Sequence, residues 1–212
     1  TNRGEKITES KPYDFNIIDT AGHVDFTVEV NRSLRVLDGL VFLFSAVDGV
    51  EPQSETNWRL ADNYKVPRMG FVNKMDRQGS NFLNVCNQIK TMLKSNAVPV
   101  VLPIGEEENF KGIVDLVKNQ AIVWHEEKMG ETFDIVDIPE EMKDEVHEYR
   151  ANLIEAVAEY DDALLEKFFD DPDSISEEEV HEALRKATQD MSIIPMICGS
   201  AFKNKGVQFL LD

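Results

Sequence analysis

The sequence has little cysteine and no long hydrophobic run, and both absences narrow the class of protein. Only Cys86 and Cys198 occur among the 212 residues, and they fit neither a metal-ligand spacing nor a disulfide framework. We therefore expect both cysteines in the core and the protein in a reducing compartment. No run approaches the ~18 apolar residues that cross a bilayer, and the stretch "TNRGEKITES" (1–10) has no apolar signal region. These features predict a soluble, cytoplasmic protein without membrane contact.

Cations are also scarce, with 22 lysines and arginines against 40 aspartates and glutamates and a net charge of -18. Because a nucleic-acid binder needs cations to displace the counterions of phosphate, we expect no direct, sequence-specific binding of nucleic acid. The excess of acidic residues is unevenly distributed along the chain, since residues 126–190 hold 23 of the acidic residues and only 6 of the basic ones. This split predicts two units with different surfaces, the acidic one being a solvated face or a docking surface for a basic partner.

Apolar runs of strand length alternate with helical patterns over much of the chain. The runs are "YDFNIID" (13–19), "LVFLFSAV" (40–47), "RMGFVN" (68–73) and "IIPMIC" (193–198), and helical spacing is found in 24–37 and 81–93. Near-continuous apolar strands joined by helices indicate an α/β fold with a mainly parallel sheet and helices on both faces.

The hydrophobic pattern changes near Ala97, where short strand-like runs with turn residues begin. Acidic helical patterns follow from Pro139 to about Asp190. We interpret residues 98–190 as an inserted α+β subdomain, docked on the domain formed by residues 1–97 and 191–212.

The stretch "NIIDTAGH" (16–23) places polar residues where a predicted strand ends. An aspartate such as Asp19 can hold Mg²⁺ through water, and the amide of Gly22 can approach a terminal phosphate because glycine has no Cβ. His23 can then orient an attacking water. Taken alone, the pattern is more typical of an ordinary strand end with Asp19 capping a helix.

Two more polar clusters follow buried strands, "NKMD" (73–76) and "GSA" (199–201). The Asp76 carboxylate can accept from N1–H and the N2 amine of guanine, Lys74 can lie over the base, and Asn73 can pin neighbouring loops. Ser200 can brace its loop while the Ala201 N–H points at guanine O6. Alone, each cluster is also typical of a polar turn.

The three clusters together are more specific, because open α/β sheets bind ligands at the carboxyl ends of their strands. In this order they resemble the third, fourth and fifth motifs of a P-loop GTPase. The stretches "DTAGHVDFTVEVNRSLRVLDG", "DGVEPQSETNWR" and "FVNKMDRQGSNF" narrow the resemblance to the elongation factor G family, as does the acidic insertion between "NKMD" and "GSA".

This resemblance implies a ribosome-dependent GTPase that drives translocation, with GTP or GDP and Mg²⁺ as cofactors. It implies nucleotide contacts from Asp19, Gly22, the "NKMD" residues and the "GSA" residues, a water-mediated Mg²⁺ contact from Asp19, and catalysis by His23. The acidic insert would contact the ribosomal stalk protein. A ribosomal protection protein or release-factor GTPase is the alternative within the same class. A non-hydrolysing ribosome-interaction module, which binds nucleotide without turnover, is the alternative of a different class.

Two features depart from the family pattern. The family usually has proline at the position of Ala21, and no "GxxxxGK[ST]" stretch, which would cradle the phosphates, occurs in the sequence. We therefore interpret the chain as a fragment that lacks the first strand and the P-loop, and we expect it to bind no nucleotide tightly and to be inactive alone. We also expect the strands at 13–19 and 40–47 to pair with each other or to leave a local gap.

Overall fold

The computed structural model describes residues 14–20, 27–125 and 130–211. Its strands are β1 (Leu40–Ser45), β2 (Arg68–Asn73), β3 (Ala97–Pro99), β4 (Val101–Ile104), β5 (Gly112–Asp115), β6 (Gln120–Trp124), β7 (Phe133–Val136) and β8 (Ile194–Cys198). Its helices are α1 (Thr27–Leu34), α2 (Pro52–Asn63), α3 (Phe82–Met92), α4 (Lys143–Ala158), α5 (Asp162–Asp170), α6 (Glu177–Gln189) and α7 (Val207–Leu211), with short 3-10 turns at Glu107–Asn109, Glu140–Met142 and Pro172–Ser174.

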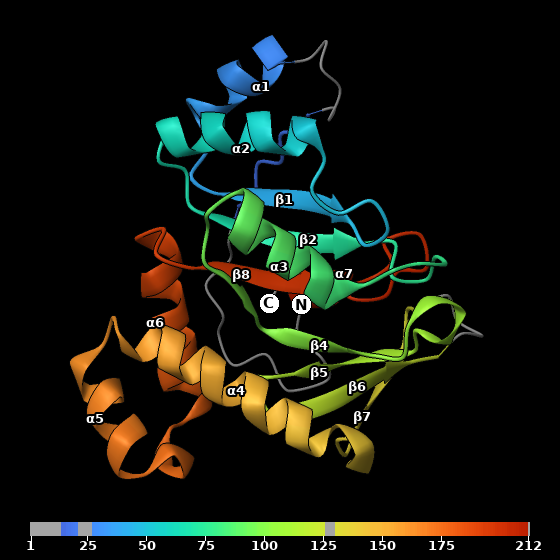
Figure 1. Cartoon of the computed structure of the whole chain (residues 1–212), viewed down its shortest axis with the longest axis vertical. Helices are drawn as coiled ribbons and strands as arrows, with labels where there is room; N and C mark the ends of the chain where they lie inside the picture. Colours follow the sequence, from blue (N-terminus) through green and yellow to red (C-terminus); the bar gives the residue numbers. More distant parts are fainter. Residues whose placement is uncertain (1–13, 21–26, 126–129, 212) are drawn as a thin grey trace.

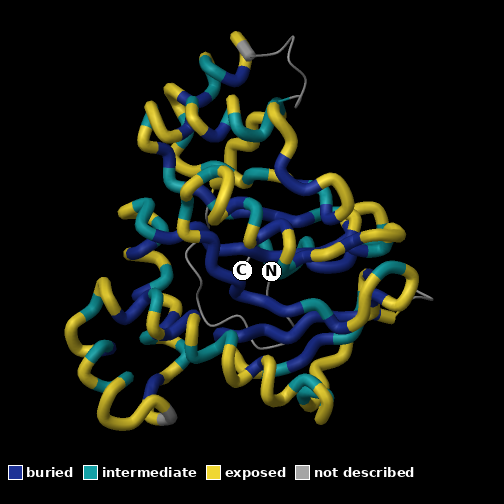
Figure 2. Tube along the Cα trace, in the orientation of Figure 1, coloured by how far each residue is buried: buried dark blue, intermediate teal, exposed yellow. Residues whose placement is uncertain are grey.

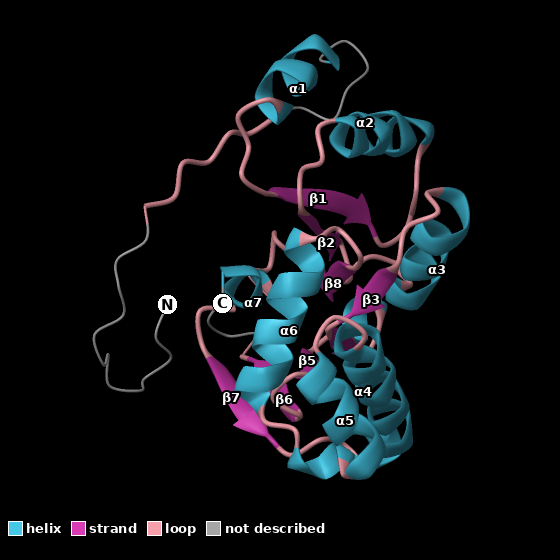
Figure 3. Cartoon of the chain, turned by 90° about the vertical axis from the view of Figure 1, so that its left-hand side faces the viewer, coloured by secondary structure: helices cyan, strands magenta, loops and turns pink. Residues whose placement is uncertain are grey.

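The first sheet is parallel, with strand order β1-β2-β8-β3 (Figure 1). Its central strand β8 is buried at all five positions, as an apolar strand covered on both faces should be. Figure 3 shows α3 on one side of this sheet and α6 and α7 on the other. The α/β class and the parallel sheet with helices on both faces, predicted from the sequence, are therefore confirmed.

The prediction of a strand at 13–19 is wrong for the residues of this segment that the structure describes. Residues 14–20 form no strand, and Phe15 and Ile17 are 75% and 88% exposed. Figure 3 shows this segment as an extended loop beside the sheet. Strands are stable only when a neighbour takes their backbone hydrogen bonds. β1 pairs with β2 alone among the described strands, so neither the expected pairing with β1 nor a gap inside the sheet occurs, and the segment faces water.

The second sheet is antiparallel, in the order β4-β5-β6-β7, and continues directly from the first. Between β3 and β4, the Val100 N–H donates to Met196 in the first sheet, while the Val100 carbonyl accepts from Leu116 in the second. Buried residues follow the strands of both sheets (Figure 2) and belong to one hydrophobic cluster. The predicted boundary at 97/98 falls within β3, a strand of the first sheet, and it remains a prediction.

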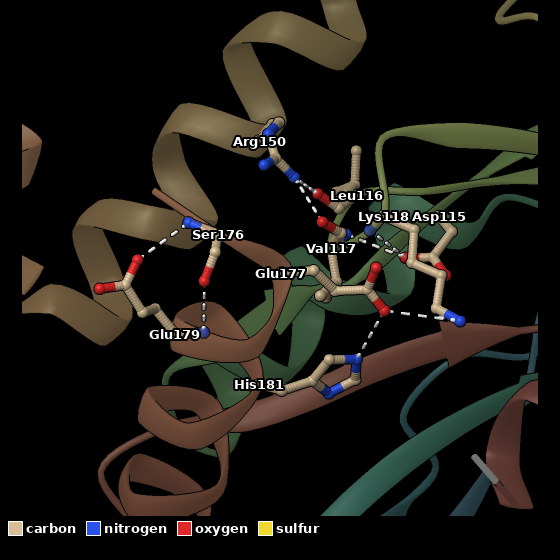
Figure 4. A network of polar contacts seen from close by, with 9 residues as sticks. All are labelled: Asp115, Leu116, Val117, Lys118, Arg150, Ser176, Glu177, Glu179 and His181. Carbon is tan, nitrogen blue, oxygen red and sulfur yellow. Dashed lines mark hydrogen bonds and ion pairs between the residues drawn. The ribbon is translucent and has the colours of Figure 1, made fainter. Parts of the chain in front are cut away.

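Polar contacts fasten helices α4 and α6 to the second sheet (Figure 4). Arg150 of α4 donates to the carbonyls of Leu116 and Val117 in the β5–β6 turn. Lys118 in the same turn lies 3.5 Å from Glu177 of α6. α6 begins with a capping box, in which Ser176 and Glu179 satisfy each other's backbone N–H groups. The contacts of Arg150 and Lys118 hold α4 and α6 against the second sheet.

Both cysteines are buried and free, as the sequence predicts. Burial raises the pKa of the Cys86 thiol to about 12, so this thiol stays protonated and unreactive. Within the described ranges, every helix is too short or too polar to cross a bilayer.

Candidate functional site

The candidate site lies at the carboxyl edge of the parallel sheet. Figure 1 shows β1, β2 and β8 pointing toward the same edge, where the loops that follow them gather. The "NKMD" loop, residues 73–81, follows β2, and the "GSA" loop, residues 199–206, follows β8. Because β2 and β8 are parallel neighbours, both loops leave the sheet side by side. This is the edge at which open α/β sheets bind ligands.

Asn73 joins the two loops. Its side-chain Oδ1 accepts from the Ala201 N–H at 2.9 Å and from the Lys74 N–H at 2.8 Å. A backbone bond of 3.1 Å from Met75 N to the Gly199 carbonyl lies next to it. The structure thus brings together residues that are 128 positions apart in the sequence. An amide carries one hydrogen, so the Ala201 N–H must share or exchange this bond to reach a guanine O6.

Asp76 and Lys74 follow Asn73 in different environments. The Asp76 side chain is only 11% exposed, and its Oδ2 lies 3.9 Å from Lys203 Nζ of the "GSA" loop. Lys74 is half exposed, with its ammonium 3.8 Å from an Asp48 oxygen after β1. Lys74 also has a φ of 67°, a left-handed conformation that non-glycine residues seldom adopt and that is often found at functional sites.

The "GSA" loop is closed at its base by a pair of backbone bonds. Ser200 and Lys205 exchange both N–H···O contacts, each at 2.9 Å, and both residues are 1% exposed. A Cβ at Gly199 would collide with the Lys205 carbonyl, so only glycine fits there. The buried Ser200 thus pairs with Lys205 at the base of the loop, while Ala201 is exposed at its tip.

Sequence reasoning missed two residues that support these loops. Glu107, in the turn between β4 and β5, accepts from the Gly79 N–H at 2.7 Å. The buried Lys205 ammonium donates to the Phe110 carbonyl of the same turn at 2.9 Å. No sequence signal identified either residue, because their partners lie 28 and 95 residues away along the chain.

Most of the phosphate side of the predicted site lies outside the described residues. Gly22 and His23 lie outside the described residues, so their predicted roles stay predictions. Asp19 is exposed, in the segment that forms no strand. Among the described residues there is no group of three or more histidine, cysteine, aspartate or glutamate side chains that would hold a metal ion.

A parallel sheet with helices on both faces, and "NKMD" and "GSA" loops joined at its carboxyl edge, is the arrangement of an α/β domain of the P-loop GTPase type. The family described as the elongation factor Tu GTP binding domain matches residues 4–212. The chain belongs to this family.

Similar proteins agree with this assignment. The chain is 72% identical to an elongation factor G of Cytophaga hutchinsonii and 59% identical to one of Amoebophilus asiaticus, each time over 100% of this chain and 30% of the relative. A crystal structure of a Thermus thermophilus protein has a TM-score of 0.77 at 25% identity, over 89% of this chain and 28% of that chain. The chain thus spans less than a third of the length of these relatives, and it resembles a GTP-binding domain of the elongation factor G type.

Proposed function

We propose that the chain forms the base-reading part of the GTP-binding domain of a ribosome-dependent GTPase that promotes translocation in protein synthesis. The Asp76 carboxylate accepts from N1–H and the N2 amine of guanine, a donor pair that adenine does not present. The stem of Lys74 covers the base, and the Ala201 N–H serves guanine O6. The observation that supports this most is the 2.9 Å bond from Ala201 N to Asn73 Oδ1, which joins both base-reading loops.

We assign the phosphate side of the reaction to Asp19, Gly22 and His23. The Gly22 amide approaches the terminal phosphate, and His23 orients the attacking water. In the full-length protein Asp19 would hold Mg²⁺ through water, and the ion would neutralise charge on the phosphates. Since no "GxxxxGK[ST]" stretch occurs in the sequence, we propose that the 212-residue chain by itself hydrolyses no GTP.

We assign the acidic insert, residues 98–190, to contact with the ribosome, and more specifically with a basic domain of the stalk protein. Its 3-10 turn at Glu140–Met142 and its helices α4, α5 and α6 present many exposed carboxylates. Complementary charge speeds encounter with a basic partner and makes the binding depend on salt.

Base selection in the full-length protein tests the guanine assignment. Asp76→Asn replaces an acceptor with an amide that can donate to the C2 carbonyl of xanthine, so the preference for GDP over XDP should fall at least about tenfold. Competition against a fluorescent guanine nucleotide measures this preference. Asp38→Asn, the same change at an exposed aspartate before β1, is the matched control. An unchanged preference would show that Asp76 does not read the base.

Turnover separates a GTPase from a ribosome-interaction module that binds nucleotide without hydrolysis. Phosphate release by the full-length protein should rise when ribosomes are added. Nucleotide binding without any ribosome-stimulated release would favour the non-hydrolysing module.

A further inference from the structure

The turn between β4 and β5, residues 105–111, contacts the "NKMD" loop through Glu107. Glu107 Oε1 accepts from the Gly79 N–H at 2.7 Å. The Glu107 N–H donates in turn to Ser80 Oγ at 3.3 Å, and the Ser80 hydroxyl donates to the Met75 carbonyl at 2.9 Å. A chain of hydrogen bonds thus leads from the insert to the residue before Asp76.

The same turn also contacts the "GSA" loop. The Lys205 ammonium is buried and donates to the Phe110 carbonyl at 2.9 Å. Since the Lys205 backbone is bonded in both directions to Ser200, this contact fixes the base of the loop that carries Ala201. One turn of the insert therefore holds both loops that are proposed to read the base.

The backbone of this turn is in an unfavourable conformation. Glu107 has a φ of 55°, in the left-handed region that glutamate seldom adopts. Gly105, with a φ of 78°, allows the tight turn because a Cβ there would collide with the Asn109 carbonyl. Such strain persists only where surrounding contacts determine it, and it is concentrated at sites that position other groups.

We propose that Glu107 is a positioning residue for guanine binding, which fixes the "NKMD" loop so that Asp76 faces the base. This inference rests on the proposed function, because it concerns the affinity of that same site. By linkage, a bound guanine nucleotide must favour the contact between Glu107 and Gly79 as much as the contact favours the nucleotide.

Three variants of the full-length protein test the positioning role through the affinity for GDP. Glu107→Ala removes the acceptor and should weaken GDP binding about three- to tenfold, the loss expected for one partly exposed hydrogen bond to a charged group. Glu107→Gln keeps an oxygen that can accept from Gly79 and should restore affinity to within about twofold of the wild type. Glu108→Ala, at the exposed neighbour of equal charge, is the control and should bind GDP like the wild type.

Glu107→Gly separates positioning from stability. Glycine relieves the left-handed backbone at this position, so the variant should melt no lower than Glu107→Ala yet bind GDP as weakly. Amide hydrogen exchange at Gly79 should slow when GDP binds to the wild type, and this slowing should be lost in Glu107→Ala but retained in Glu107→Gln.

The outcomes distinguish this inference from the proposed function. Equal GDP affinity of Glu107→Ala, Glu107→Gln and the wild type overturns the positioning role while leaving guanine binding intact. A Glu107→Gln variant as weak as Glu107→Ala also overturns it, because the effect would then come from the charge and not from the hydrogen bond. Absence of GDP binding by the wild type overturns both.

Discussion

The Asp115 side chain shows how burial acts on a single charge in this protein. Asp115 ends β5 and is buried, and its Oδ1 accepts from the Val117 and Lys118 N–H groups at 2.9 and 3.1 Å (Figure 4). Burial raises the pKa of its carboxyl, while these two hydrogen bonds and the charges of Lys118 and His181 act in the opposite direction with smaller effect. The carboxylate therefore serves the β5–β6 turn as an acceptor at an electrostatic cost.

We compare the free energy of unfolding of Asp115→Asn with that of the wild type. The difference should favour the variant more near neutral pH than in acid. The folded pKa of Asp115 is raised above its unfolded value, so the wild type loses stability as the pH rises from the ordinary aspartate range through the folded pKa. Asparagine keeps an oxygen for both N–H groups and does not titrate. Urea unfolding of both proteins at about pH 4 and about pH 7 measures the difference. A difference that is the same at both values would contradict the raised pKa.

Residues of the site could be predicted from the sequence only where a general rule places them. Asn73 and Ala201 both follow buried apolar strands, and the rule that parallel strands end at one edge was sufficient to bring them together. Glu107 and Lys205 follow no such rule. Their partners lie 28 and 95 residues away, and the contacts depend on how the second sheet is placed against the first.

At the scale of elements, hydrophobic periodicity identified most of the fold. β2 spans the predicted 68–73, and α3 lies within the predicted helical pattern at 81–93. The segment 13–19 has equally strong strand character but forms no strand in its described part. Propensity describes how well a segment fits a pleated surface, while a strand also requires a partner for its backbone. No pattern within a segment reveals whether that partner is present.

Helix α4 carries an exposed acidic stripe that should contribute to binding a basic partner. Asp144, Glu148 and Glu155 are all exposed and are spaced by four and seven residues, so they share one face. Glu148→Lys should weaken binding to purified ribosomal stalk protein about threefold at low salt, and the difference should shrink as salt screens it over ~10 Å at 0.1 M.

Surface plasmon resonance at several salt concentrations would measure this effect. Glu29→Lys makes the same charge change at an exposed helical glutamate outside the insert and serves as the control. If both variants bind equally well, the acidic stripe does not form the contact surface.

At the scale of the whole molecule, one hydrophobic core extends through both of the proposed units. One cluster includes Phe71 and Met196 from the first sheet together with Ile113 and Ile122 from the second. Removing residues 98–190 would therefore expose core side chains of the parallel sheet. Point substitutions on the surface of the insert report its binding more cleanly than its deletion, because they leave this shared core intact.

The 212-residue chain should bind GDP only weakly, because it holds the loops that we propose to read the base but no "GxxxxGK[ST]" stretch to cradle the phosphates. Each charge-assisted hydrogen bond to phosphate contributes about 1.5 to 3 kcal/mol. Losing several of them removes most of the affinity, while the proposed contacts of Asp76 and Lys74 with the base remain. Calorimetry should therefore detect binding no tighter than about millimolar, little affected by Mg²⁺. A dissociation constant of about micromolar or below with clear Mg²⁺ dependence would show that these residues supply phosphate contacts of their own.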